Sequence, residues 1–375
     1  MRIQIVSWRD PLNPKAGGAE VCLLEISRRL ISRFEHQVSW FAPEFAGSSL
    51  TDEYQGIQIE RRGRFAAVHL ETLRRFLGKG RQTSDFYLED YHGLTLGLSW
   101  FLRKPHVIFV HEVAGPIWFE MWKFPVSWTG FALEKLSLKF LRRAHFIAAS
   151  RSTKQDLVDH GIAAMRIFTV NEASDIAFVE SPRDRTSRAG QFLFIGRICK
   201  MKRIDLLLAS FARHLARCAS SKLVLVGTMD EDFRSEFESL TRRLRIENAV
   251  ELRGRVSQEM KAELLGTSLA LVSCSMREGF GLVVVEANSQ GTPALTFDVN
   301  GYRDLIQNGI NGFMVDFADV DALALKMCDL VEMDAARYQR LCDSSLRASR
   351  AYSWDQTAAD VNRIIAQIIH SETEA

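Results

Sequence analysis

The stretch Glu278-Gly279-Phe280-Gly281-Leu282-Val283-Val284-Val285-Glu286 decides the fold. Residues 269–274 just before it have the composition of a short buried strand. The order of strand, glycine turn and apolar run predicts a β-turn-α unit. Glu278 then lies in the turn, and Glu286 lies about two helical turns inside the helix, on the same face. The alternative is a helix cap followed by one solvated glutamate.

This unit has groups that suit a ligand with phosphate and hydroxyl groups. The glycines let backbone N–H groups approach a ligand, and the start of a helix favours phosphate. Two carboxylates accept hydrogen bonds from vicinal hydroxyls, such as those of a sugar and a ribose. Glu278 and Glu286 are therefore candidate ligands for these two groups.

The same alternation of short apolar runs and helical patterns extends along the chain. The predicted strands are residues 3–8, 37–42, 57–61, 86–89, 106–111, 146–149 and 167–170 in the first half, and 192–195, 223–226, 250–252, 269–274, 294–297 and 313–315 in the second. Strands separated by helices indicate βαβ units and parallel sheets. The fold class predicted is therefore α/β, with two doubly wound, Rossmann-like domains facing across a cleft.

The domain boundaries follow from the same pattern. Residues 1–178 are predicted to form the N-terminal domain and residues 191–353 the C-terminal domain. Residues 179–190 lack apolar periodicity and are predicted to be the linker. Residues 354–370 form an amphipathic helix that no longer alternates with strands.

Composition excludes several classes of protein. The chain has 375 residues, 47% of them hydrophobic and 25% charged, and its net charge of +2 demands no nucleic acid. Its 6 cysteines show no CxxC pair, so we expect core residues in a reducing compartment. No apolar run is long enough to span a bilayer, and the first strand leaves no room for a signal peptide, so we expect a cytoplasmic protein.

Polar and glycine residues follow several predicted strands, where ligands of open α/β sheets bind. Arg197 and Lys202 follow residues 192–195 and suit a diphosphate, although they can also be solvated charges. His111 ends residues 106–111 and can equally be a structural histidine. Gly17 and Gly18 open a helix, where backbone N–H groups can meet phosphate or form a plain turn.

These residues resemble a known family. Gly196-Arg197, then Lys202-Arg203-Ile204-Asp205, then Glu278 and Glu286 resemble the signature of family 4 retaining glycosyltransferases with the GT-B fold. Further agreeing segments are Gly17-Gly18-Ala19-Glu20, Ala149-Ser150 with Thr153-Lys154, Val250-Glu251-Leu252-Arg253-Gly254 and Gly291-Thr292-Pro293. The resemblance covers nearly the whole chain.

The resemblance implies a role for each residue. Arg197 and Lys202 would hold the donor diphosphate, Glu278 the donor sugar and Glu286 the ribose. The backbone amides of Gly279, Phe280 and Gly281 would approach the sugar and the phosphate. Gly17 and Gly18 would help to bind the donor. The His111 ring would point at the sugar and the forming bond. The N-terminal domain would bind the acceptor, the C-terminal domain the nucleotide sugar, and the last helix would cross back onto the first domain.

The implied reaction is metal-independent hexosyl transfer from a UDP- or GDP-sugar with retention, without a cofactor. The cations would stabilise the leaving diphosphate, so the catalytic residues would be His111, Glu278, Arg197 and Lys202. One departure from the family pattern matters: Asn171-Glu172-Ala173-Ser174-Asp175 stands where the family has Asn-Gly-Val-Asp. Because this chain lacks the glycine of the family pattern, the local turn and any acceptor contact there are expected to differ.

Basic and aromatic residues concentrate in the first half. The residues concerned are Arg61, Arg62, Arg64, Arg74, Arg75, Lys79 and Arg81 with Phe65, Leu73, Phe76 and Leu77, and then Trp118, Phe119, Met121, Trp122, Phe124, Trp128 and Phe131 with Lys135, Lys139, Arg142 and Arg143. This mixture suits an anionic membrane surface, and core packing with solvated charges is the alternative. A membrane location predicts a lipid-linked or glycan acceptor, cell-surface polysaccharide or glycoconjugate synthesis, and peripheral attachment to the inner face of the cell membrane.

Other functions fit less well. A sugar-nucleotide epimerase of the same fold would convert its substrate without an acceptor, and a phosphorylase would need a pyridoxal lysine that nothing marks. A non-catalytic nucleotide-binding protein would not need Arg197, Lys202, Glu278 and Glu286 together. No GxGxxG follows a predicted strand and no Walker A sequence occurs, which argues against a dinucleotide oxidoreductase and a P-loop enzyme.

Overall fold

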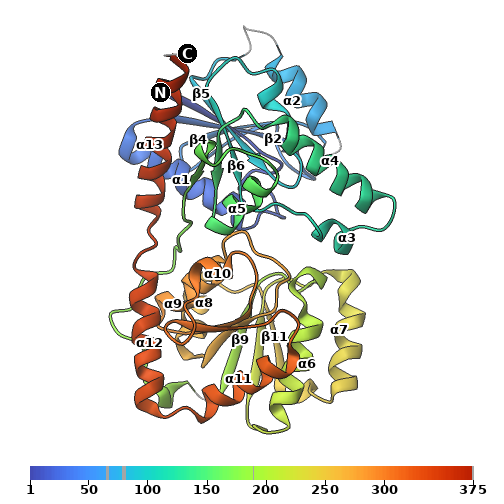
Figure 1. Ribbon diagram of the computed structural model, residues 1–375, viewed down its shortest axis with the longest axis vertical. Helices are drawn as coiled ribbons and strands as arrows, with labels where there is room; N and C mark the ends of the chain where they lie inside the picture. Colours follow the sequence, from blue (N-terminus) through green and yellow to red (C-terminus); the bar gives the residue numbers. More distant parts are fainter. Residues whose placement is uncertain (65–66, 78–81, 189, 374–375) are drawn as a thin grey trace. The chain divides into compact units, whose positions relative to one another are not determined.

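The computed structural model describes residues 1–64, 67–77, 82–188 and 190–373 (Figure 1). The chain divides into two units. Unit 1 is Met1–Ala173 with Ser353–Ala375, and unit 2 is Ser174–Tyr352. Each unit is built on its own sheet with helices packed against it, which confirms the predicted class of two parallel-sheet α/β domains.

Unit 1 holds a sheet of eight strands in the order β3-β4-β2-β1-β5-β6-β7-β8. The strands are β1 (Arg2–Val6), β2 (Gln37–Glu44), β3 (Thr51–Tyr54), β4 (Ile57–Arg64), β5 (Phe86–Tyr91), β6 (His106–Val110), β7 (Phe146–Ala148) and β8 (Ile167–Thr169). Every pairing is parallel except that of β3 with β4. The sequence did not predict β3, because its residues Thr-Asp-Glu-Tyr form a polar edge strand without a buried face.

The helices of unit 1 are α1 (Gly18–Phe34), α2 (Val68–Phe76), α3 (Ile117–Met121), α4 (Val126–Phe140), α5 (Arg151–Asp159) and α13 (Trp354–Thr373), with 3-10 turns at Leu98–Trp100 and Ala164–Arg166. The last helix, α13, lies beside α1 (Figure 1). Its Thr357 Oγ1 donates to the Asn171 carbonyl at 2.7 Å, which fixes the segment that follows β8.

Unit 2 holds a six-stranded parallel sheet in the order β11-β10-β9-β12-β13-β14. Its strands are β9 (Gln191–Ile195), β10 (Lys222–Val226), β11 (Val250–Gly254), β12 (Ala270–Ser273), β13 (Ala294–Phe297) and β14 (Gly312–Val315). The order reverses between β9 and β12, and ligands of doubly wound sheets bind beyond the strand ends at such a switch point.

The helices of unit 2 are α6 (Ile204–Leu215), α7 (Glu231–Leu244), α8 (Gln258–Thr267), α9 (Leu282–Ser289), α10 (Tyr302–Leu305), α11 (Val320–Glu332) and α12 (Ala335–Ser349). Its 3-10 turns are Arg185–Ser187, Lys200–Lys202 and Glu247–Ala249. Strands β10, β12 and β13 are almost entirely buried, as expected for the inner strands of a parallel sheet covered on both faces.

The predicted linker differs from the structure. Residues 174–188 belong to unit 2, and the change of unit comes after Ala173 and not at residues 179–190. The Arg188 side chain is fully buried and donates to the Ser268 carbonyl at 3.0 Å and to Thr292 Oγ1 at 2.6 Å. Sequence periodicity missed this segment because one buried arginine anchors it where apolar residues would normally do so. Ala189 lies outside the described residues.

Candidate functional site

The candidate site of unit 2 lies at the switch point of its sheet. Arg197 and Lys202 follow β9, and Glu278 follows the neighbouring strand β12. The carboxyl ends of parallel neighbours meet at one edge, so these three residues start from the same edge. Topology therefore places them where the sequence predicts a ligand.

Lys202 and Glu278 contact each other directly. Lys202 Nζ donates to Glu278 Oε1 at 2.5 Å, and Tyr302 Oη donates to the same oxygen at 3.1 Å. Burial raises the pKa of Glu278, but the charge of Lys202 and hydrogen bonds from Lys202, Ser275 and Tyr302 outweigh it, so the net pKa is lowered. Glu278 is therefore held as a carboxylate, the form that accepts hydrogen bonds from hydroxyls.

Tyr302 is a site residue that the sequence analysis missed. It is fully buried at the start of α10, and its hydroxyl also lies 2.7 Å from Ser273 Oγ. Burial raises the pKa of Tyr302 well above the usual tyrosine range, so it remains a hydrogen-bond donor. The only sequence feature that could have indicated a role for Tyr302 is its position directly after residues 298–301, the loop that follows β13.

Glycines shape the backbone around Glu278. Gly301 has φ 84°, and a Cβ there would lie 2.6 Å from the Glu278 carbonyl oxygen. Gly281 has φ 101° and precedes α9, and a Cβ there would lie 2.9 Å from the Tyr302 ring. Only glycine fits both conformation and space at these positions. Phe280 is buried with its ring 5.7 Å from that of Tyr352, so its side chain serves packing and only its backbone is suited to a ligand.

Glu286 has a different partner. It is the fifth residue of α9, about one turn inside and not two, because the helix begins only at Leu282. Lys261 Nζ of α8 donates to Glu286 Oε1 at 2.6 Å. Burial nevertheless raises the pKa of Glu286, with the Lys261 charge opposing and Asp175 adding to the rise. Lys261 was missed because a lysine in a charged helix resembles a solvated one.

Arg197 stands apart from this network. Its side chain is 56% exposed, and its Nε lies 3.9 Å from Asp230 Oδ1. The structure therefore brings Lys202 and Glu278 together but leaves the Arg197 guanidinium in a loose, solvated ion pair. Such a side chain is able to reorient towards an anionic ligand at little cost.

In unit 1, His111 lies at the carboxyl end of β6 and is buried. Its Nδ1 lies 2.8 Å from Glu172 Oε1, and its Nε2 lies 3.6 Å from Asp90 Oδ1. Both ring nitrogens thus face carboxylates. Glu172, which occupies the position of the family glycine, is a partner that the sequence analysis did not foresee.

A second histidine, His92, pairs with the Asp90 carboxylate beside His111. His92 Nε2 lies 3.1 Å from Asp90 Oδ2 and 3.8 Å from Glu20 Oε1. Burial lowers the pKa of His92, but the Asp90 and Glu20 charges raise it to a net value of about 9. Burial raises the pKa of Asp90, and the charges of His92, His111 and Arg9 outweigh it, so the net pKa is lowered.

Gly17 and Gly18 open α1 as predicted, but a side chain already occupies the turn. The Gly17 amide donates to Glu20 Oε2 at 2.7 Å. Glu20 is buried and also pairs with Arg9 at 3.4 Å. A phosphate at this helix start would therefore have to displace the Glu20 carboxylate.

Donor atoms with metal-binding chemistry come together in three groups of the described residues, each within 4.8 Å. The groups are His214 with Cys218 and Cys328, Cys22 with His111 and Glu172, and Glu20 with Asp90 and His92. Asp-x-Asp spacing also occurs at Asp230-Glu231-Asp232 and Asp319-Val320-Asp321, at the starts of α7 and α11. Metal independence therefore stays a prediction.

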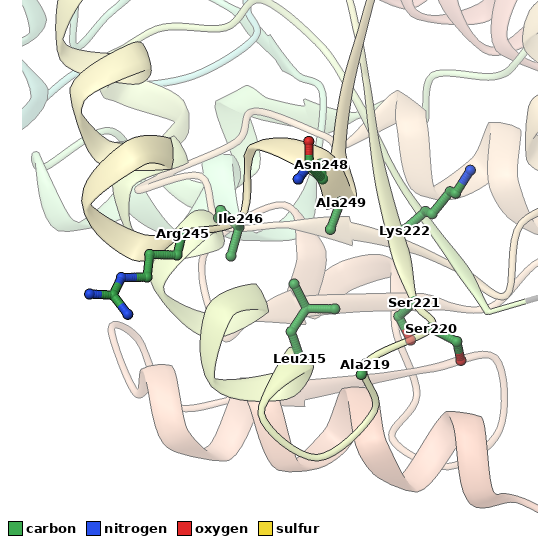
Figure 2. Close-up of a pocket in the computed structure, with 9 residues that line it drawn as sticks. All are labelled: Leu215, Ala219, Ser220, Ser221, Lys222, Arg245, Ile246, Asn248 and Ala249. Atoms are coloured by element: carbon green, nitrogen blue, oxygen red, sulfur yellow. The ribbon is translucent and has the colours of Figure 1, made fainter.

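Unit 2 also has an open hollow of about 310 Å³. Figure 2 shows its lining residues, among them Leu215 at the end of α6, Lys222 at the start of β10 and Arg245 after α7. These positions belong to the amino ends of the strands. The hollow is therefore at the opposite edge of the sheet from Lys202 and Glu278.

Comparison with known proteins identifies the family. The "Glycosyltransferase Family 4" domain matches residues 16–178, and "Glycosyl transferases group 1" matches residues 181–343. The chain belongs to glycosyltransferase family 4.

Two curated relatives show the sequence similarity. A D-inositol 3-phosphate glycosyltransferase of Nocardioides sp. is 32% identical over 215 residues, which cover 52% of this chain and 46% of the relative. A phosphatidyl-myo-inositol mannosyltransferase of Mycolicibacterium smegmatis is 30% identical over 198 residues, which cover 51% of this chain and 49% of the relative. The chain thus spans about half the length of the curated relatives it matches.

Solved structures show the same fold. Anabaena HepE in complex with UDP and glucose has a TM-score of 0.75 at 19% identity, covering 97% of this chain and 99% of that one. The sucrose-phosphate synthase of Thermosynechococcus elongatus has a TM-score of 0.80 at 18% identity, covering 99% of each chain. These likenesses confirm the GT-B fold class of this family member.

Proposed function

We propose that this chain is a retaining hexosyltransferase. It moves a sugar from a UDP- or GDP-sugar to a glycan or lipid-linked acceptor, in the synthesis of cell-surface polysaccharide or glycoconjugate. The observation that carries the proposal is the contact of Lys202 and Tyr302 with the ionised Glu278 at the switch point of unit 2. The relatives named above, a D-inositol 3-phosphate glycosyltransferase and a phosphatidyl-myo-inositol mannosyltransferase, support a phosphorylated or lipid acceptor.

Each residue has a role in the proposal. Glu278 accepts hydrogen bonds from hydroxyls of the donor sugar, and Glu286 accepts from the ribose. Lys202 and Arg197 bind the diphosphate, Lys202 as a point charge and Arg197 as a planar fork. His111 is proposed as a further catalytic residue.

Breaking the anomeric C–O bond leaves negative charge on the diphosphate and positive charge on the sugar ring. Fixed cations near the phosphate therefore stabilise the transition state. Glu278 is paired with a cation and not free as a nucleophile, so we propose attack by the acceptor hydroxyl on the face that the diphosphate leaves. The hydroxyl proton passes to the departing phosphate oxygen, and the products are a glycoside and a nucleoside diphosphate. No residue in this scheme requires a metal or another cofactor.

A thermal-shift panel of UDP-, GDP-, ADP- and TDP-sugars tests the donor, because a ligand that binds the folded state stabilises it by mass action. We expect one nucleotide to raise the melting temperature of the wild type and to lose its effect in Lys202→Ala. Lys222→Ala is the matched lysine control, because Lys222 lies at the opposite edge of the sheet. Equal shifts of the melting temperature in Lys202→Ala and Lys222→Ala would contradict the site.

A separate assay without an acceptor tests the rival function. Conversion of the sugar nucleotide under these conditions would favour an epimerase.

The proposal of a lipid-linked acceptor is supported by an exposed group of aromatic and aliphatic side chains on and between α3 and α4, called the aromatic patch below. Its members are Phe119, Met121, Trp122, Phe124, Val126, Trp128, Leu133, Leu136 and Phe140, with exposed fractions from 40% to 79%. Lys135, Lys139, Arg142 and Arg143 are exposed in the same segment. Apolar and basic side chains together suit an anionic membrane surface, and core packing does not explain such exposure.

The basic segment before this patch contributes less than the sequence suggests. Arg61 and Phe76 are fully buried, and Arg62, Arg74 and Arg75 pair with Glu60 or Glu71. Phe65, Lys79 and Arg81 lie outside the described residues. No helix of the described chain is both long and apolar enough to cross a bilayer. We therefore propose peripheral attachment through the aromatic patch, on the cytoplasmic face.

Liposome flotation tests this attachment. We expect the wild type to float with vesicles that contain anionic phosphatidylglycerol and less with neutral phosphatidylcholine alone. Phe124→Ser with Trp128→Ser should reduce flotation, whereas Met165→Ser, at an 87% exposed position outside the patch, should not. Flotation that is independent of both lipid charge and the patch would refute the membrane proposal.

A further inference from the structure

Glu172 lies in a fixed part of unit 1. It follows β8, where Val170 N donates to the Ala148 carbonyl at 3.0 Å and Thr357 Oγ1 donates to the Asn171 carbonyl at 2.7 Å. Its own side chain is buried. The backbone on the N-terminal side of Glu172 is therefore tied to both the sheet and α13.

The contact between Glu172 and His111 determines which ring nitrogen carries a proton. Glu172 Oε1 lies 2.8 Å from His111 Nδ1. An ionised carboxylate only accepts hydrogen bonds, so Nδ1 must be the donor. A flipped ring would place a carbon at this position and lose the bond. Phe109 also restrains the ring, at a centroid distance of 4.6 Å and an interplanar angle of 26°.

The other ring nitrogen is left without a hydrogen-bond partner among the described residues. Nε2 lies 3.6 Å from Asp90 Oδ1, which is beyond hydrogen-bond range. Asp90 is nearer to His92, at 3.1 Å. Nε2 is therefore a buried ring atom that makes no hydrogen bond to the described residues, and Nδ1 is the atom through which the protein holds the ring.

Charged and titratable groups from several elements of unit 1 gather around the His111 ring and its neighbour Asp90. They are Glu20 and Cys22 from α1, Arg9 after β1, Asp90 and His92 from β5 and its end, and Glu172 after β8. Burial, then the charges of Glu172 and Asp90, raise the pKa of Cys22 well above its usual value, so it is a neutral thiol. Asp90 and His92 pair with each other, which leaves Glu172 as the short-range partner of His111.

We infer that Glu172 is the positioning residue of His111: by accepting the Nδ1 proton it fixes the orientation and one tautomer of the ring that acts on the substrate. The inference rests on the proposed function, because it requires His111 to act on the donor or acceptor. Glu172 itself does not touch the substrate. The effect resembles that of other residues that hold a functional imidazole in one tautomer.

The test combines kinetics with the ¹⁵N NMR spectrum of the histidine-labelled chain. In the wild type, the spectrum should show a single His111 tautomer with the proton on Nδ1. Glu172→Ala should give both tautomers and lower kcat on the order of 10- to 100-fold, with the donor KM changed less than about threefold. Glu172→Asp, which keeps an acceptor, should recover part of the rate. An unchanged tautomer and an unchanged kcat in Glu172→Ala would overturn the inference.

Two controls separate the possible causes. Glu134→Gln alters another buried carboxylate of unit 1, which accepts from the Ala114 and Gly115 amides, and it should leave the His111 signals unchanged. His111→Ala tests the underlying function. If it keeps the full rate, the role of His111 is wrong; if it is inactive while Glu172→Ala keeps the full rate, only the role of Glu172 is wrong. His111→Ala/Glu172→Ala should be no slower than His111→Ala.

Discussion

Lys202 Nζ and Glu278 Oε1 lie 2.5 Å apart, so the cation expected at the diphosphate and the carboxylate expected at the sugar are partners of each other. Their side chains are 26% and 17% exposed, which makes the pair largely shielded from solvent. A bound donor would have to share or replace this contact. The two opposite charges thus balance each other and hold the two side chains in position.

This contact predicts coupled effects of substitution. Lys202→Ala and Glu278→Ala should each lower kcat/KM on the order of 10²- to 10³-fold, because each removes a charged contact made at the reacting groups. Since each change also removes the other residue's partner, the double variant should be less impaired than the product of the two effects, by about 0.5–3 kcal/mol. Strictly additive effects in this double-mutant cycle would show that the pair does not act as a unit. Lys222→Ala serves as the control.

Gly301 should be far less tolerant of substitution than Gly309. Both have positive φ, 84° and 77°, so alanine strains the backbone at either position by about 1–2 kcal/mol. A Cβ at Gly301 would lie 2.6 Å from the Glu278 carbonyl oxygen, whereas one at Gly309 meets nothing within 4 Å. Gly301→Ala should therefore cost an additional 1–3 kcal/mol of unfolding free energy and also reduce donor binding. Urea denaturation measures the difference, and equal losses would contradict the close approach.

Much of the fold was predictable because parallel strands leave a strong signal. The runs that became β9, β12 and β13 are short, apolar and buried on both faces, and the glycine turn before Leu282 marks the start of α9. The polar strand β3 and the segment anchored by Arg188 gave no such signal, because one lies at a sheet edge and the other is held by hydrogen bonds.

The site was predictable in part. Lys202 and Glu278 could be proposed from their places after adjacent strands, but their contact could not, because it depends on the loop conformation after each strand. Tyr302, Lys261 and Glu172 were missed for the same reason. Each acts through a contact between residues at least 24 positions apart in sequence, and a single sequence carries no distance information of that kind.

Arg61 should be important for stability and not for membrane binding. Its Nε and Nη2 donate to Asp10 at 2.7 and 2.9 Å, and both side chains are fully buried. Arg61→Ala leaves the Asp10 carboxylate buried without its partner, which should cost about 3–5 kcal/mol of unfolding free energy. Arg62→Ala, at a 44% exposed position, should change it by less than about 0.5 kcal/mol. Thermal melting of both variants distinguishes the two roles, and a similar loss in each would contradict the buried pair.

The free energy of unfolding should fall at alkaline pH, because His92 then loses its proton. Its pKa is raised from 6.5 to about 9, mainly by Asp90 against the opposing effect of burial, so the folded state binds the proton more tightly than the unfolded state. The resulting stability is fully present below pH 6.5 and is lost as the pH rises through about 9, by up to about 3 kcal/mol. Urea denaturation at pH 6, 7.5 and 9.5 measures this slope. His92→Gln should flatten it by removing the proton site, and Asp90→Asn should flatten it by removing the charge that raises the pKa. A slope that persists in both variants would mean that another group is responsible.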